Sequence, residues 1–129
     1  MHIMLSNSSI EPIYGQIVHQ IRNLILGGEL KPGQALPSIR QLAKDLQISV
    51  ITTKRAYEEL EKEGLIDSVM GKGSFVSGAS PEFLKEQRLR LLEGKILDVL
   101  RESRSLQMTF EELVAHMRFA LEEMEETDE

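Results

Sequence analysis

The chain has 129 residues, no cysteine and a formal net charge of −6 at pH 7. The absence of cysteine excludes a disulfide framework and a thiolate metal site, and this length allows one domain or a small domain with an appendage. The sequence contains no run of roughly 18 apolar residues and no basic segment followed by an apolar stretch. We therefore expect no membrane span, no export signal and a cytoplasmic location.

The negative charge is concentrated in the C-terminal part of the chain. Residues 1–78 hold eight Lys and Arg against eight Asp and Glu, whereas residues 79–129 hold seven against thirteen. The run Gly78-Ala79-Ser80-Pro81 at this change of charge is typical of a linker. We therefore predict two domains, over residues 1–78 and 79–129. A neutral first domain still allows nucleic-acid binding, because binding needs only a local basic face.

The first strong pattern is an amphipathic helix over residues 12–26. Pro12 suits the first turn of a helix, and Gly27 with Gly28 ends it. The segment Leu30–Leu36 that follows contains Pro32-Gly33 and is predicted to be extended, as a third small strand beside a later hairpin. Residues 1–9 are polar, and we expect them to be poorly fixed, although His2–Leu5 could form a short strand or dock an apolar end. The apolar stripe of the first helix consists of Ile13, Ile17, Ile21, Leu24 and Ile25.

Residues 37–66 read as two helices joined by a tight turn. Ser38 is a suitable N-cap for a helix ending at Leu46, and Ser49 is a suitable N-cap for a helix from about Val50 to Glu63. Two short helices with a three-residue turn are typical of a helix-turn-helix, whose second helix enters the DNA major groove by its N-terminal end. An ordinary helical hairpin with a solvated outer face is the alternative.

The composition of the second helix favours DNA binding. Its N-terminal end offers apolar, hydroxyl and cationic side chains, and its acidic residues are confined to the C-terminal half, away from phosphates. The hydroxyl and ammonium groups of Thr52 and Lys54 are expected to contact phosphates rather than bases. Arg55 could reach a phosphate or pair with a glutamate of its own helix. The residues at this end are Val50, Ile51, Thr52, Lys54 and Arg55.

A β-hairpin is predicted directly after these helices. Two short apolar runs, residues 65–69 and 74–76, flank Gly71-Lys72-Gly73, which is a hairpin signal. A hairpin with a cation at its tip after a helix-turn-helix is the wing of a winged helix. Plain turn chemistry would also explain the two glycines.

Six short motifs occur in the order and spacing of a known family. Together they resemble the N-terminal domain of GntR-type bacterial transcription regulators, and the short remainder of the chain resembles the YtrA-like subfamily. The resemblance implies a mainly α fold with a small β-hairpin (α+β): an N-terminal winged helix-turn-helix plus a C-terminal two-helix dimerisation hairpin. The motifs are Gly28–Gly33 (GELKPG), Leu36–Ala43 (LPSIRQLA), Ile48-Ser49, Thr53–Leu60 (TKRAYEEL), Gly64–Ile66 (GLI) and Gly71–Val76 (GKGSFV).

The resemblance also implies site residues. Arg40 matches the arginine of the family's LPS-x-R motif, which contacts DNA, although a salt bridge with Asp45 or a surface glutamate is the alternative for its side chain. Gly71 matches a glycine that approaches the minor groove, and Lys72 is the expected wing cation. Many members have an arginine where this chain has Val50, so the wider family's base preference does not carry over. The predicted DNA-binding residues are Ser38, Arg40, Ser49, Val50, Ile51, Thr52, Lys54, Arg55, Gly71 and Lys72.

Two further helices are predicted after the linker. The first runs from Glu82 to Arg101, with a break at residues 103–105, and a capping-box spacing at Thr109 starts the second. Residues 122–129 form an acidic end that we expect to be frayed or disordered. A hairpin this small is marginal alone, so a second copy of it is expected to cover its apolar stripes; packing on its own winged helix is the alternative. The predicted dimerisation residues are Leu89, Leu92, Ile96, Val99, Phe110, Leu113, Val114, Met117 and Leu121.

These patterns predict a transcription regulator rather than an enzyme. His2, His19 and His116 are scattered without metal-ligand spacing, so we expect no metal, no cofactor and no catalytic site. The expected partners are operator DNA with a palindromic sequence and a second copy of the chain, and the expected role is repression. The resemblance implies an ABC-transporter operon as target. The sequence names no small-molecule effector, and a protein-interaction module built on a winged helix remains the alternative.

Overall fold

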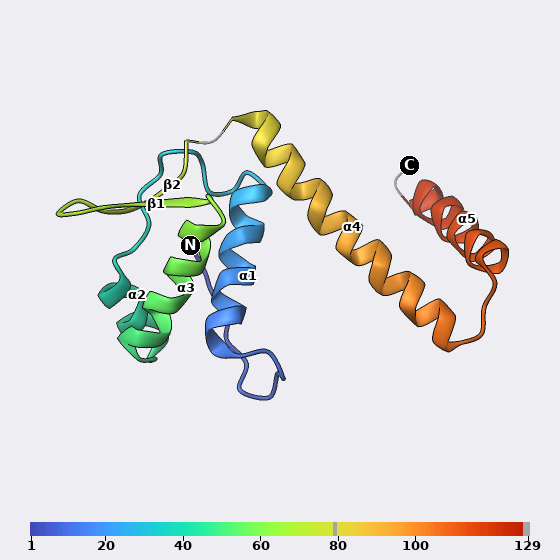
Figure 1. Cartoon of the computed structure of the whole chain (residues 1–129), viewed down its shortest axis with the longest axis horizontal. Helices are drawn as coiled ribbons and strands as arrows, with labels where there is room; N and C mark the ends of the chain where they lie inside the picture. Colours follow the sequence, from blue (N-terminus) through green and yellow to red (C-terminus); the bar gives the residue numbers. More distant parts are fainter. Residues whose placement is uncertain (79, 128–129) are drawn as a thin grey trace. The chain divides into compact units, whose positions relative to one another are not determined.

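The computed structural model describes residues 1–78 and 80–127 and consists of five helices and one β-hairpin (Figure 1). The chain divides into two compact units, Met1–Gln87 and Arg88–Glu129. The predicted mainly α fold with a small hairpin is confirmed. The elements are α1 (Ile13–Leu26), α2 (Ile39–Leu46), α3 (Val50–Lys62), β1 (Ile66–Val69), β2 (Gly73–Val76), α4 (Pro81–Ser105) and α5 (Phe110–Thr127).

The core of the first unit lies where α1 and α2 pack against α3. Ile17 and Ile21 of α1 and Ala56 and Leu60 of α3 are fully buried. Figure 1 shows α1 beside α3, with the hairpin at the C-terminal end of α3. The predicted apolar stripes therefore do form this core, and they leave the opposite face of α3 exposed.

Serine caps start both helices of the helix-turn-helix, as the sequence predicted. The Ser38 hydroxyl oxygen accepts a hydrogen bond of 3.0 Å from the Gln41 backbone N–H, and the Ser49 hydroxyl oxygen accepts one of 3.0 Å from the Thr52 N–H. Between the helices, Gln47 adopts a left-handed conformation with φ 56°. This single residue reverses the chain and allows the three-residue turn.

The hairpin pairs Ile66 with Val76 and Val69 with Gly73, in antiparallel register. The segment before α2 pairs with β2 through one isolated bridge, Ala35 with Phe75, rather than as the expected third strand. Pro32 and Pro37 bracket this segment, and proline cannot donate to a β-ladder. The pairing is therefore limited to a few backbone bonds, including Leu36 N–H to the Ser74 carbonyl at 2.9 Å.

The N-terminal segment is docked on α1, and forms no strand. The Gln20 side chain bonds both backbone groups of Met4, at 2.9 Å to its N–H and 2.7 Å to its carbonyl. One turn earlier, Gln16 bonds both backbone groups of Ser6, at 2.8 and 2.9 Å. Two side-chain amides thus replace the backbone partners that a strand would need, and Ile3 is buried beside them.

Two predictions for the C-terminal helices were wrong in detail. The helix α4 continues through residues 103–105, because the Ser103 hydroxyl donates to the Leu100 carbonyl at 2.8 Å and so remains compatible with the helix. The chain turns instead at Gln107, with φ 59°. Helix α5 runs to Thr127, so the expected disorder does not start at residue 122; residues 128–129 lie outside the described residues.

The predicted cap of α5 is confirmed. The Thr109 hydroxyl oxygen accepts from the Glu112 N–H at 3.1 Å, and the Glu112 carboxylate accepts from the Thr109 N–H at 3.3 Å. These two bonds form a reciprocal capping box.

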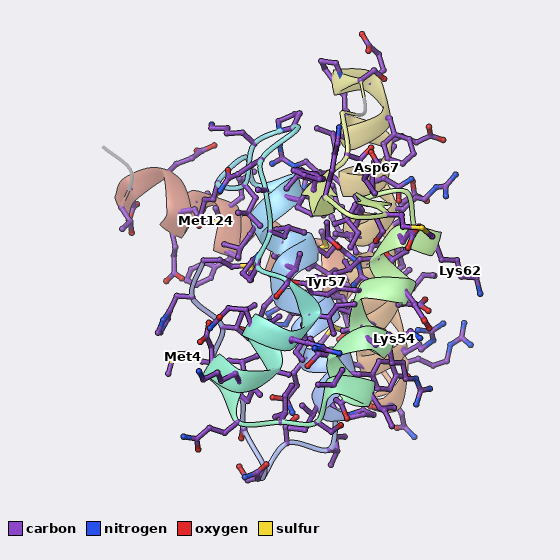
Figure 2. The ribbon with its side chains drawn as sticks, turned by 90° about the vertical axis from the view of Figure 1, so that its left-hand side faces the viewer. Met4, Lys54, Tyr57, Lys62, Asp67 and Met124 are labelled. Carbon is purple, nitrogen blue, oxygen red and sulfur yellow. The ribbon has the colours of Figure 1, made fainter. Side chains whose placement is uncertain are left out.

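Tyr57 links the two helices of the helix-turn-helix. Its side chain is 1% exposed, and its hydroxyl donates a 2.8 Å hydrogen bond to the Pro37 carbonyl, directly before the cap of α2. Figure 2 shows Tyr57 among the helices of the first unit. Burial disfavours the phenolate and raises the pKa of Tyr57 to about 12.

We predict that this buried hydroxyl makes stability fall at high pH. Because the pKa of Tyr57 is higher in the folded state than in the unfolded state, its contribution is complete below pH 10 and is lost between pH 10 and about 12. Urea unfolding of the wild type should show a loss of roughly 1 kcal/mol from this group between pH 8 and 11. Tyr57→Phe should lack this component and should be less stable at pH 8 by about 1 kcal/mol. Equal pH dependence of the two proteins would contradict the prediction.

Candidate nucleic-acid interface

The first turn of α3 presents apolar side chains to the outside. Val50 is 47% exposed and Ile51 is 81% exposed, whereas Thr53 is completely buried. Ile51 lies on the side of the helix opposite the buried residues, and Val50 is half exposed because it is the first residue of α3. Exposed branched side chains at a helix end can contact thymine methyl groups in a major groove.

The two predicted serines act as helix caps in this structure. The Ser49 hydroxyl both accepts from the Thr52 N–H and donates to the Thr52 hydroxyl oxygen at 2.8 Å. The Thr52 hydroxyl, which accepts from Ser49, can therefore direct its own hydrogen outward. The Ser38 hydroxyl accepts from Gln41 in the same way and keeps its hydrogen for an outside acceptor.

Arg40 and Lys54 provide exposed cations near these caps. The alternative salt bridge between Arg40 and Asp45 is absent from the described residues; the Gln41 amide donates to Asp45 instead, at 2.7 Å. Lys54 lies 3.8 Å from Glu58 one turn later, with both side chains well exposed. A pair of this kind contributes little and leaves Lys54 available for a phosphate.

Arg55 pairs with no glutamate of its own helix among the described residues, while its predicted contact with a phosphate stays a prediction. Its guanidinium carbon lies 3.8 Å from the centre of the Tyr14 ring in the first turn of α1. Tyr14 is not among the site residues predicted from the sequence, because the contact joins residues far apart in the chain. A half-buried aromatic residue beside an exposed arginine becomes visible only once α1 and α3 are packed together.

The wing tip is exposed and depends on glycine. Gly71 has φ 78°, which side chains rarely adopt, and the Lys72 N–H closes the turn on the Val69 carbonyl at 3.0 Å. Lys72 is exposed as predicted, and Met70 beside it is fully exposed. Figure 1 shows this loop and α2 on the same side of the first unit, with α1 on the other side of α3.

The predicted dimerisation stripes remain largely uncovered in the single chain. Leu92 and Ile96 of α4 and Phe110 and Met117 of α5 are about half exposed or more. Leu113 is buried within the second unit, at 8% exposure. The other predicted residues follow this pattern: Leu89, Val99 and Leu121 are exposed and Val114 is half-buried.

Comparison with known proteins identifies the family. Residues 13–76, which span the helices and hairpin described above, match the family model for bacterial regulatory proteins of the gntR family. The chain is 32% identical over 111 residues to the transcriptional repressor YtrA of Bacillus subtilis, covering 86% of this chain and 85% of YtrA. The chain belongs to the GntR family. Its relatives are transcription regulators, so the protein is a DNA-binding regulator and not an enzyme.

Solved GntR structures agree with this fold. A GntR family transcriptional regulator from Listeria monocytogenes matches with a TM-score of 0.75 and 29% identity, over 88% of this chain and 97% of that one. AraR(DBD) in complex with operator ORX1 matches with a TM-score of 0.53 and 28% identity, over 60% of this chain and 96% of that one. Among the described residues, no helix is long and apolar enough to span a membrane.

We predict that Arg40 reads a base. Arg40→Ala should weaken binding to operator DNA by about 1–3 kcal/mol and should affect random DNA less. Fluorescence anisotropy titrations against both DNAs would measure the difference. Lys62→Ala is the matched control, because it removes an exposed cation at the far end of α3; Figure 2 shows Lys54 and Lys62 separated along this helix. Equal weakening on both DNAs would make Arg40 a phosphate contact.

Proposed function

We propose that the protein is a homodimeric repressor that binds an operator of two inverted half-sites. The observation that carries the proposal is the first turn of α3, where exposed Val50 and Ile51 adjoin the hydroxyl of Thr52 and the ammonium group of Lys54. In a major groove, the apolar side chains of such a turn can contact base edges, and its hydroxyl and ammonium groups can contact phosphates. The similarity to AraR(DBD), solved in complex with operator ORX1, supports DNA binding by this part of the chain.

Each predicted site residue takes a role consistent with its surroundings. Val50 and Ile51 contact thymine methyl groups, and Arg40 reads a base. Ser38 and Ser49 hold the two helix starts at the DNA surface. The wing, with Gly71 and Lys72, lies along the backbone or in the minor groove. Thr52, Lys54 and Arg55 contact phosphates.

Dimerisation is the second half of the proposal. Apolar faces of α4 and α5 are exposed in the single chain, and burying them stabilises an assembly by roughly 25 cal/mol for each Å² covered. A second copy presents the same faces across a two-fold axis and forms a four-helix arrangement. A symmetric dimer binds two half-sites about one helical turn apart or a multiple of it. The operator is therefore expected to be palindromic.

The proposed target is an operon for an ABC transporter. The resemblance to YtrA-like regulators supports this choice, and the similarity to YtrA covers most of both chains. Repression would follow from a dimer that occupies the promoter and excludes the polymerase.

The proposal is tested by titrating the protein against DNA from upstream of its own gene, with unrelated DNA as control. Selective binding with two protomers per site, weakened steeply between 50 and 200 mM salt, is the expected result. Equal weak binding to both DNAs would place the operator elsewhere. The absence of binding at low salt would favour a winged-helix protein-interaction module.

We predict that a charge in the exposed stripe of α4 separates the dimer. Ile96→Glu should weaken self-association by roughly 3 kcal/mol, because an unpaired carboxylate would be buried at the interface. Gly94→Glu is the matched control: two residues earlier, it adds the same charge on the opposite face of the helix, where nothing lies within 4 Å of an added Cβ. Sedimentation equilibrium would measure both. A dimeric Ile96→Glu protein would rule out this face as the interface.

A further inference from the structure

The contact between Arg55 and Tyr14 has a geometry that suits DNA binding. The guanidinium carbon lies over the ring, 3.8 Å from its centre, which is within the range of a cation–π contact. Tyr14 is half-buried at the second position of α1, and Arg55 is exposed. The ring is therefore partly held by the fold, and the cation above it is accessible from outside.

Stacking on the ring leaves the hydrogen-bond donors of Arg55 available. The five N–H groups lie in the plane of the guanidinium and point away from its edge. Among the described residues, no carboxylate forms an ion pair with Arg55, because Glu58 lies near Lys54 instead. A planar cation with a free edge is the group that binds a phosphate through two parallel hydrogen bonds.

Arg55 stands at the border of the exposed face of α3. It lies one turn after Ile51, on the flank that α1 adjoins (Figure 1). A helix in the major groove has base edges beneath its centre and phosphates along its flanks. Arg55 is therefore placed for the sugar-phosphate backbone rather than for a base.

We propose that Tyr14 is a positioning residue for DNA binding, whose ring holds Arg55 ready for a backbone phosphate. The inference rests on the proposed placement of α3 in the major groove. An arginine that is free in solution loses side-chain freedom when it binds a phosphate. Stacking on Tyr14 restricts Arg55 before DNA arrives, and this preorganisation increases affinity without a new contact to DNA.

A double-mutant cycle tests the role of Tyr14. Arg55→Gln should weaken binding to random duplex DNA at low salt by about tenfold and reduce the slope of log affinity against log salt by about 1. Tyr14→Leu should weaken binding by about two- to fivefold, and Tyr14→Phe, which keeps the ring, should bind like the wild type. In the Arg55→Gln background, Tyr14→Leu should have no further effect.

The cycle separates positioning from a general structural role. If Tyr14→Leu weakens binding by the same factor with Arg55 present and absent, the ring acts only through the fold and the inference is overturned. Arg55→Lys provides an independent arm that leaves Tyr14 intact: it keeps the charge but not the planar stack. It should lose affinity severalfold with an unchanged salt slope, and wild-type affinity would also overturn the inference. A wild-type protein that binds no DNA would instead reject the proposed function.

Discussion

The buried face of α3 is the constraint on which the DNA-binding unit depends. Thr53, Ala56, Tyr57 and Leu60 are all buried, and the Tyr57 hydroxyl bonds the carbonyl of Pro37 at 2.8 Å. This bond connects the middle of α3 to the residue before the cap of α2. With one face held in the core, rotation of α3 about its axis is blocked. The exposed face at its N-terminal end is therefore determined by packing.

Both local and tertiary interactions position the side chains at this exposed face. The caps at Ser38 and Ser49 set where each helix begins, and they do so with bonds to residues three positions later. The stacking of Arg55 on Tyr14 depends instead on α1, which is distant in sequence. Cations presented by short, rigid elements lose less freedom on binding than cations on mobile loops. The same packing that stabilises the fold thus determines where Arg55 lies.

The helices α4 and α5 bury few side chains. Among the described residues, Leu113 is the one buried residue of α5, and α4 has no buried residue. The acidic charge of residues 79–129 repels DNA at long range, especially at low salt. Apolar stripes on an acidic surface suit association with another copy better than contact with DNA. The distribution of charge and apolar area along the chain is therefore consistent with separate binding and assembly roles.

Local patterns predicted the helices, the caps and the hairpin, because periodicity, serine caps and glycine turns act over a few residues. The family motifs between Gly28 and Val76 are also short runs of residues, and they indicated DNA binding. The break predicted at residues 103–105 was wrong: α4 continues to Ser105. Serine is tolerated inside a helix when its hydroxyl donates a hydrogen bond to a carbonyl of the preceding turn. Three features depend on the packed fold: the partner of Arg55, the docking of the N-terminal segment on Gln16 and Gln20, and the hydrogen bond of Tyr57. These contacts join residues that are far apart in the chain, so no local pattern records them.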